Sequence, residues 1–419
     1  MNSLLGGEIV VLRMALFFVV VFVPLTGPPI AYGDWKQDFT RALKNGGAYV
    51  ERDDGVVLYA YREDDHFIPA SSLKIATAAY ALTLGEDFRF KTEFYISEQG
   101  DLYVKGKGDP MLVSEELQTA SREIAKRIRR VRNIILDDSY FLPGVVIDGA
   151  SQSTNPYDAI NGALLANFNT VFFRKLKNGT VQSAEPQTPL TATAHRIAAK
   201  AGAGEQRINL GRDRELSERY VGELLAAFLE TEGVRFEGEI RLGMAPKNSS
   251  PTFVYESSKP LREHLREMLK YSTNFMANQL FLILGAEKFG APGSVPKSQR
   301  AFREFLQERV GWQDFMVAEG AGLSRKNRVT PKQMVQLLRY FEPHKNLLSK
   351  EEDLFLAKTG SLSGVNTLAG YFDLADGHAA RFSILVNDSV PFRYKFELAR
   401  RMHHGLTKSN HQKRAGSTD

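Results

Sequence analysis

Residues 69–85 form the segment PASSLKIATAAYALTLG, which predicts a helix that begins near Ser71 and ends at Gly85. Serine is favoured at a helix N-terminus, and glycine is a frequent stop. Because residues three apart share one helix face, we expect Lys74 beside Ser71. A serine hydroxyl is activated when a neighbouring base takes its proton, and a lysine whose pKa is lowered by burial is such a base. Standing alone, the pair would more often be a capping serine with a solvated lysine.

The same S-x-x-K pattern recurs at Ser294 and Lys297. Here we expect Pro296 to break the run, so that the serine and the lysine do not share a helix face. An S-x-N pattern ends at Asn155, and the Pro156 that follows it predicts a loop. Local context therefore favours the first S-x-x-K copy as the functional one.

A second S-x-N copy, at Ser272 and Asn274, lies between two stretches with helical spacing of apolar residues, 260–270 and 275–284. In extended backbone, residues two apart point to the same side of the chain. We therefore expect the serine hydroxyl and the asparagine amide to face one pocket. The alternative is that one of the two residues caps the second helix.

The residues Lys358, Thr359 and Gly360 follow the apolar run 354–357, which predicts a strand that ends at this K-T-G sequence. A lysine charge and a threonine hydroxyl suit the anionic end of a substrate, and a glycine lets a ligand backbone approach closely. The alternative is a polar strand end followed by a turn.

The three motifs in this order resemble those of penicillin-binding proteins and class A β-lactamases. Longer stretches are similar to the D-alanyl-D-alanine carboxypeptidases of the penicillin-binding-protein-4 type, peptidase family S13. These stretches are GKGDP (106–110), LDDSYF (136–141), NFN (167–169), EGAGLSR (319–325) and KTGSLSGVNTLAGY (358–371). A β-lactamase is not expected to carry the last stretch, nor the long insertion between the first two motifs.

The chain also departs from the family pattern. The family usually has Asp-Gly-Ser-Gly-Leu-Ser where this chain has Glu319 and Ala321. The segments 325–358 and 74–272 are short for the family. These differences concern the outer pocket and the substrate preference rather than the acylation centre.

The resemblance implies an α/β (α+β) fold, with a penicillin-binding transpeptidase-like domain whose antiparallel sheet is flanked by helices. We expect this domain to be discontinuous, from 34–88 and 254–405, with a smaller inserted α/β domain at 89–253. The local patterns agree. Strands are predicted at 48–51, 56–61, 92–96, 102–104, 133–136, 171–175, 367–372 and 381–386, helices at 35–43, 114–130, 214–230 and 391–404, and hairpin turns at 53–55 and 178–179.

The resemblance also implies a serine-type D-Ala-D-Ala carboxypeptidase that acts on peptidoglycan stem peptides and binds β-lactam antibiotics as inhibitors. Ser71 would attack the carbonyl of the penultimate D-alanine, Lys74 would be the base, and Ser272 would relay a proton to the leaving D-alanine. Asn274 would hold the substrate amide. No metal or cofactor is implied.

The K-T-G region would bind the substrate's end. Lys358 and Thr359 would bind the terminal carboxylate, and Gly360 would admit the substrate backbone. The backbone N–H groups of Ser71 and Ser361 would form the oxyanion hole by analogy with the family.

Arg325 and Asp137 are candidates for an outer pocket. An arginine and an aspartate together suit the carboxylate and the amine of a zwitterionic diamino acid, such as diaminopimelate. The alternative is a structural ion pair or two solvated charges.

The N-terminus carries an apolar run, residues 14–23, followed by prolines and the small-residue stretch 31–33. This pattern is typical of a secretory signal, so we expect residues 1–33 to be a signal peptide and the chain to be exported to the periplasm or cell envelope. The alternative is an uncleaved anchor, which also exports the remaining chain. Residues 406–419 are polar and predict a disordered tail.

Composition excludes several classes of function. The chain has no cysteine, which rules out disulfides and thiol catalysis. Its net charge of +5 is modest, and the basic run 126–132 falls at the end of a predicted helix, where it indicates a solvated face rather than a nucleic-acid site.

Three rival functions stay open. A serine β-lactamase uses the same motifs but hydrolyses its acyl-enzyme quickly. A D,D-endopeptidase performs the same chemistry on a larger substrate. A catalytically silent peptidoglycan-binding protein has no need of all four of Ser71, Lys74, Ser272 and Lys358.

Overall fold

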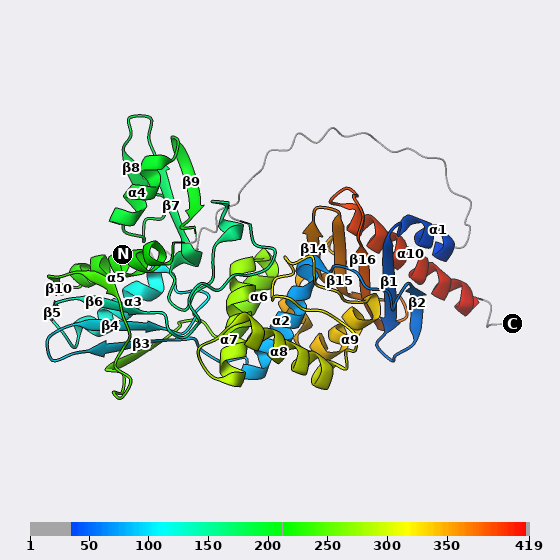
Figure 1. Ribbon diagram of the computed structural model, residues 1–419. Helices are drawn as coiled ribbons and strands as arrows, with labels where there is room; N and C mark the ends of the chain where they lie inside the picture. The colour runs from blue at the N-terminus through cyan, green and yellow to red at the C-terminus, as the bar shows by residue number, and fades with distance from the viewer. Residues whose placement is uncertain (1–34, 152, 212, 416–419) are drawn as a thin grey trace, which may run out of the picture.

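Figure 1 shows the computed structural model of the 419-residue chain, which describes residues 35–151, 153–211 and 213–415. The predicted signal peptide, residues 1–33, lies outside the described residues. Within the described ranges, no helix combines the length and the apolar character needed to cross a membrane.

The larger sheet has six strands in the order β13-β14-β15-β16-β1-β2, and all neighbouring strands run antiparallel. The strands are β1 (Gly46–Arg52), β2 (Val57–Tyr61), β13 (Ser349–Glu351), β14 (Phe355–Leu362), β15 (Val365–Asp373) and β16 (Ala379–Val386). The two ends of the chain meet in this sheet, because β1 pairs with β16 and Gly46 lies opposite Val386. The predicted antiparallel sheet from both chain ends is confirmed.

Helices cover both faces of the six-stranded sheet (Figure 1). The helices of this part of the chain are α1 (Trp35–Ala42), α2 (Lys74–Ala81), α6 (Leu261–Tyr271), α7 (Asn274–Phe289), α8 (Val295–Phe305), α9 (Pro331–Phe341) and α10 (Tyr394–Ala415). On one face, Phe39 of α1 and Met402 of α10 share an apolar cluster with Phe382 of the sheet. The other helices form a second apolar cluster with the opposite face, and α2 lies inside it.

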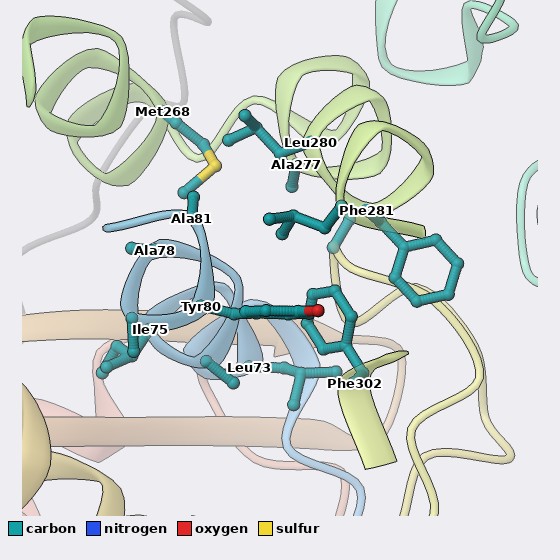
Figure 2. Close-up of a cluster of buried hydrophobic side chains, with 14 of the residues drawn as sticks. Leu73, Ile75, Ala78, Tyr80, Ala81, Met268, Ala277, Leu280, Phe281 and Phe302 are labelled. Atoms are coloured by element: carbon teal, nitrogen blue, oxygen red, sulfur yellow. The ribbon is translucent and has the colours of Figure 1, made fainter. Parts of the chain in front are cut away.

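Helix α2 is the centre of this second cluster, and all eight of its residues are buried. Its Tyr80 ring stacks on Phe305 at 4.6 Å and meets Phe302 edge-on at 5.1 Å. Figure 2 shows Met268 of α6 above the helix and Phe281 of α7 on the same side as Phe302, whose ring lies 5.0 Å from that of Phe281. A helix that is apolar on all sides is stable only in the interior. The core therefore fixes the helix that begins at the lysine of the S-x-x-K motif.

The segment between α2 and α6 forms a separate body with its own apolar cluster. Its five-stranded sheet has the order β11-β6-β4-β3-β12, and its other sheets have the orders β8-β7-β9 and β10-β5. The elements are β3 (Lys91–Ile96), β4 (Leu102–Gly106), α3 (Ser114–Ala125), β5 (Arg130–Val131), β6 (Ile134–Asp137), β7 (Thr170–Lys175), β8 (Val181–Ser183), α4 (Ala192–Lys200), β9 (Gly204–Asn209), α5 (Arg214–Thr231), β10 (Arg235–Phe236), β11 (Ile240–Leu242) and β12 (Phe253–Glu256). Strand β12 pairs with β3, so this sheet reaches past the predicted boundary at residue 253.

Short helical turns connect these elements. They are the 3-10 turns η1 (Ala70–Leu73), η2 (Leu82–Leu84), η3 (Pro156–Asp158), η4 (Asn167–Asn169) and η6 (Glu342–Leu347), and the π-helical turn η5 (Leu306–Val310). The predicted stop of the first motif's helix is confirmed, because Gly85, with φ of 101°, ends η2.

Two predicted helix ends were wrong. Helix α3 ends at Ala125 instead of near residue 130, since Val131 is buried in β5 beside β10. The basic run 126–132 therefore lies mainly on a loop and a strand, where several of its charges form ion pairs with carboxylates. Helix α10 continues to Ala415, although a disordered tail was predicted from residue 406. No glycine or proline lies between residues 406 and 415 to stop it.

Candidate active site

Lys74 lies at the centre of three hydrogen bonds. Its Nζ is 2.9 Å from Ser71 Oγ, 2.8 Å from Asn274 Oδ1 and 2.7 Å from the carbonyl oxygen of Ala321. The structure thus brings together residues of the first two sequence motifs and adds a backbone carbonyl from a third segment.

Burial lowers the pKa of Lys74 well below its ordinary value. Desolvation is the largest cause, and the Lys358 ammonium lowers the pKa further, whereas Glu319 raises it. The Lys74 side chain is fully buried, so its charged form has little water to stabilise it. A neutral amine at this position is therefore accessible.

The three partners determine where a neutral Lys74 would direct its lone pair. The oxygens of Asn274 and Ala321 only accept hydrogen bonds, so they take the two N–H groups of a neutral amine. The lone pair then faces Ser71 Oγ. After proton transfer, the ammonium has three donors for the same three oxygens. The site is suited to a base before the transfer and to its conjugate acid afterwards.

Ser71 lies in the turn η1, directly before α2. The preceding Ala70 has φ of 47°, in the left-handed region that costs a non-glycine residue about 1–2 kcal/mol. Gly322 packs against this turn, and a Cβ at Gly322 would lie 1.9 Å from the Ala70 carbonyl oxygen. The loop that contains Gly322 therefore packs tightly against the strained turn at Ala70 and stabilises it.

The loop that supplies the Ala321 carbonyl is itself fixed by buried side chains. The Glu319 carboxylate accepts the Ala321 N–H at 2.8 Å. The Thr77 hydroxyl of α2 donates to the Gly320 carbonyl at 2.6 Å. The first bond stabilises the turn within the loop and the second ties the loop to α2, so together they hold the Ala321 carbonyl toward Lys74.

We expect Gly322→Ala to slow acylation of Ser71 by about 100-fold, because a displacement of about 1 Å at a catalytic group has an effect of this size. The added methyl would displace Ala70 and with it Ser71. The rate of covalent labelling by a fluorescent penicillin measures the effect. Gly364→Ala is the matched control, because Gly364 also has a positive φ, of 70°, but no atom within 4 Å of a Cβ. Equal rates in the two variants would contradict the steric argument.

Ser272 differs from its prediction in backbone conformation. It is left-handed, with φ of 55° and ψ of 37°, because it ends α6 with its N–H bonded to the Met268 carbonyl. Thr273 is the N-cap of α7, and Asn274 is the first helical residue, so neither predicted cap is formed. The turn between α6 and α7 places Asn274 against Lys74. Ser272, two residues before Asn274, is half-buried.

The K-T-G residues lie inside β14 and not at its end, since the strand continues to Leu362. Strand β13 pairs with β14 only as far as Ala357. From Lys358 onward, β13 leaves this edge of β14 uncovered. Such an edge can accept an extended peptide as an added strand.

Lys358 acts electrostatically on Lys74, and Gly360 lies close to Ser71. Lys358 is buried, and desolvation lowers its pKa to about 8. Its Nζ donates to the Thr359 carbonyl at 3.0 Å. A Cβ at Gly360 would lie 3.0 Å from the backbone nitrogen of Ser71. A glycine at this position lets β14 cross directly over the turn that carries Ser71.

Arg325 and Asp137 are not in contact with each other in the described structure. Asp137 is 2% exposed, and its two oxygens accept the N–H groups of Ser139 at 2.9 Å and Ala245 at 2.7 Å. Arg325 is exposed and donates to the Ser363 carbonyl at 2.5 Å. These bonds favour a structural role for Asp137, whereas the role of Arg325 stays a prediction.

The second S-x-x-K copy begins a helix, contrary to the prediction. Ser294 is the N-cap of α8, and Pro296 lies in its first turn, where a proline is tolerated because its missing N–H would have no helical partner. The Lys297 Nζ donates to the carbonyls of Gly290 at 2.6 Å and Pro292 at 2.9 Å. Both bonds direct the lysine to the preceding loop, whereas the Lys74 amine is hydrogen-bonded to Ser71 Oγ.

Two contributions to the site were not predicted. The Ala321 carbonyl is a backbone group, which no residue type reveals, although the surrounding EGAGLSR stretch was similar to the family. Lys395 of α10 reaches the K-T-G strand and donates to the Gly360 carbonyl at 2.9 Å. A lone lysine in a helix of mixed charge carries no sequence signal for such a position.

Comparison with known proteins identifies the family of this chain. The model of the D-Ala-D-Ala carboxypeptidase 3 (S13) family matches residues 37–354 and 349–402. The chain is 25% identical over 397 residues to the D-alanyl-D-alanine carboxypeptidase DacB of Haemophilus influenzae, covering 79% of this chain and 82% of that protein. It is 27% identical over 418 residues to a D-alanyl-D-alanine carboxypeptidase of Actinomadura sp. (strain R39), covering 82% and 77%.

Solved structures show the same fold. The crystal structure of penicillin binding protein 4 from Haemophilus influenzae superposes with a TM-score of 0.71 at 21% identity, over 88% of this chain and 99% of that one. Bd3459, a peptidoglycan endopeptidase of Bdellovibrio bacteriovorus, superposes with a TM-score of 0.53 at 15% identity, over 86% and 92%. The predicted α/β fold, with an antiparallel sheet flanked by helices, is confirmed. Because the family model extends over most of the sequence, this chain belongs to the D-Ala-D-Ala carboxypeptidase 3 (S13) family.

Proposed function

We propose that this chain is a serine-type D-Ala-D-Ala carboxypeptidase that acts on peptidoglycan stem peptides through an acyl-enzyme at Ser71. The observation that carries the proposal is the buried Lys74 amine, 2.9 Å from Ser71 Oγ and bonded to two further oxygens that only accept. Membership of the S13 family supports the substrate class.

In the first step, Ser71 Oγ attacks the carbonyl carbon of the penultimate D-alanine while Lys74 takes the hydroxyl proton. The carbonyl oxygen becomes an oxyanion, which the backbone N–H groups of Ser71 and Ser361 stabilise. The C–N bond then breaks, and the proton that Lys74 took passes through the Ser272 hydroxyl to the amine of the departing D-alanine, which leaves Lys74 neutral. Water attacks the acyl-enzyme ester and releases the shortened peptide, with Lys74 again as the base.

The remaining residues hold the substrate. Asn274 binds the backbone amide of the peptide, and its contact with Lys74 couples substrate binding to the base. Lys358 and Thr359 bind the terminal carboxylate, and Gly360 leaves space for the peptide beside β14. None of these steps requires a metal or a cofactor.

Mass spectrometry of the purified protein tests the proposal. With benzylpenicillin we expect one penicilloyl group per chain on Ser71, and with a pentapeptide ending in D-Ala-D-Ala we expect release of one D-alanine. Cleavage of a cross-linked muropeptide would add D,D-endopeptidase activity, which is the same chemistry on a larger substrate. Rapid turnover of penicillin would indicate a β-lactamase, and no adduct with any substrate would indicate a silent binder.

Arg325 is proposed to recognise an acidic group on the third residue of the stem peptide. It is exposed and lies on the loop that supplies Ala321. We expect Arg325→Ala to slow hydrolysis of a diaminopimelate-type peptide about tenfold, as for one lost charge-assisted bond, and to leave acylation by benzylpenicillin unchanged. Lys326→Ala, at the neighbouring exposed cation, is the control. Equal losses on both substrates would reject this role.

The apolar run at residues 14–23 supports export to the periplasm or cell envelope. We expect the mature protein to begin near Asp34. N-terminal sequencing of the protein from the envelope fraction checks this prediction, and retention of residues 1–30 would favour a membrane anchor instead.

A further inference from the structure

Lys395 is a buried lysine that the proposed mechanism does not use. It lies in the first turn of α10 and is fully buried. Its Nζ donates to the Gly360 carbonyl at 2.9 Å and lies 2.5 Å from Ser361 Oγ. The Phe392 ring lies 4.4 Å from the same nitrogen. Burying an ammonium costs free energy unless it is hydrogen-bonded. The bonds from Lys395 to the K-T-G strand therefore indicate a specific role for this lysine.

The Gly360 carbonyl that Lys395 binds belongs to the peptide unit that joins Gly360 to Ser361. In a trans peptide, the C=O of Gly360 and the N–H of Ser361 belong to one planar group and point in opposite directions. Lys395 holds the oxygen end, so the Ser361 N–H points away from the lysine. In the proposed mechanism this N–H is one of the two oxyanion donors. The other is the N–H of Ser71, whose nitrogen is 3.0 Å from a Cβ built on Gly360.

A cation bonded to a carbonyl oxygen polarises the whole amide and makes its N–H a stronger donor. The effect is larger in a buried site, where the effective dielectric constant is low. Two charged groups also act on Lys395. Burial and Lys358 of β14 lower its pKa to about 8, and Glu351 of β13 opposes this shift, so the ammonium is largely charged at pH 7.

We propose that Lys395 is a positioning residue for the oxyanion hole, whose ammonium orients and polarises the Gly360–Ser361 peptide toward the tetrahedral intermediate at Ser71. This inference rests on the proposed function, since it presupposes acylation of Ser71. Lys395 is expected to affect the rate of acylation more than the binding of substrate, because a stronger N–H donor matters most where negative charge develops on the carbonyl oxygen.

The test compares acyl-enzymes of the wild type and of Lys395→Met. Infrared spectroscopy of the penicilloyl ester, labelled at its carbonyl with carbon-13, reports the hydrogen bonds to that oxygen. We expect the carbonyl stretch of Lys395→Met to move to higher frequency. We also expect the acylation rate to fall about tenfold, less than the 10²–10³ lost with a whole oxyanion donor. The affinity for penicillin before acylation should change little.

Two further variants separate the charge from the packing. Lys395→Arg keeps a cation and is expected to retain the low carbonyl frequency, whereas neutral Lys395→Gln is expected to lose it. If Lys395→Met does not fold, the comparison of Lys395→Arg with Lys395→Gln replaces it as the test. The exposed lysine of β13 provides the control Lys350→Met, which should behave as the wild type.

The possible outcomes are distinct. A slower acylation with an unchanged carbonyl frequency in both neutral variants would assign Lys395 a structural role and overturn the inference. Unchanged rates and frequencies would overturn it as well. If the wild-type protein itself forms no penicilloyl adduct, the proposed function is rejected, and not only the role of Lys395.

Discussion

Ser71→Ala is expected to abolish the covalent penicillin adduct and to lower carboxypeptidase turnover by a factor on the order of 10⁶, the size of effect seen when a serine nucleophile is removed. No other described hydroxyl is hydrogen-bonded to the Lys74 amine, which binds only Ser71 Oγ, Asn274 Oδ1 and the Ala321 carbonyl. Intact-mass measurement after incubation with benzylpenicillin checks the loss of the adduct.

The fold should survive this substitution. One hydrogen bond from Lys74 is lost, which costs about 1 kcal/mol, and the two other acceptors remain. Ser294→Ala is the matched control, because Ser294 belongs to the second S-x-x-K copy, and it should label as the wild type does. An adduct at full yield on Ser71→Ala would reject the nucleophile, and an adduct that maps to Ser294 would transfer the role to the second copy.

Lys74→Arg is expected to reduce acylation by about 10³-fold, in the range of general-base catalysis. A guanidinium keeps its proton at any pH that the protein tolerates, so it has no lone pair for the serine proton. Stopped-flow acylation by a chromogenic β-lactam measures the rate. Lys297→Arg, at the lysine of the second copy, is the control and should keep the wild-type rate.

The pH dependence provides an independent check on this base. Because the pKa of Lys74 is lowered, the neutral amine becomes available at lower pH than for an ordinary lysine. Below that pKa the amine is protonated and cannot accept the serine proton, so the acylation rate should rise with pH through an acidic limb. A rate that is independent of pH on the acidic side, or a Lys74→Arg variant within a few-fold of the wild type, would mean that another group is the base.

Much of this site could be predicted because its chemistry is local in sequence. Ser71 and Lys74 are one helical turn apart, at the junction of η1 with α2, and all eight residues of α2 are buried. Their proximity therefore follows from the sequence spacing alone. The alternation of strands at the C-terminal end likewise predicted the sheet and the strand that carries Lys358.

Other features depend on tertiary contacts that a local pattern does not contain. Ser272 was expected in extended backbone, but the end of α6 imposes a left-handed residue there. Pro296 was expected to break a helix and instead lies in its first turn, where the same chemical property is harmless. The position of Lys395 depends on how α10 lies on the sheet. Its role therefore appears only once the fold is assembled.

The site's assembly from distant segments has a consequence for the newly made chain. Lys74 meets Asn274 and Ala321 at sequence separations of 200 and 247 residues, and the sheet beside it closes only when β1 pairs with β16. Contacts of such high contact order form late, because the chain must first close long loops. Before they form, Lys74 is solvated and lacks the burial that lowers its pKa, so in the proposed mechanism Ser71 has no base. In this mechanism the newly made chain does not react with penicillin until its C-terminal strands have paired. The rate at which penicillin labelling appears during refolding would therefore measure the final step of folding.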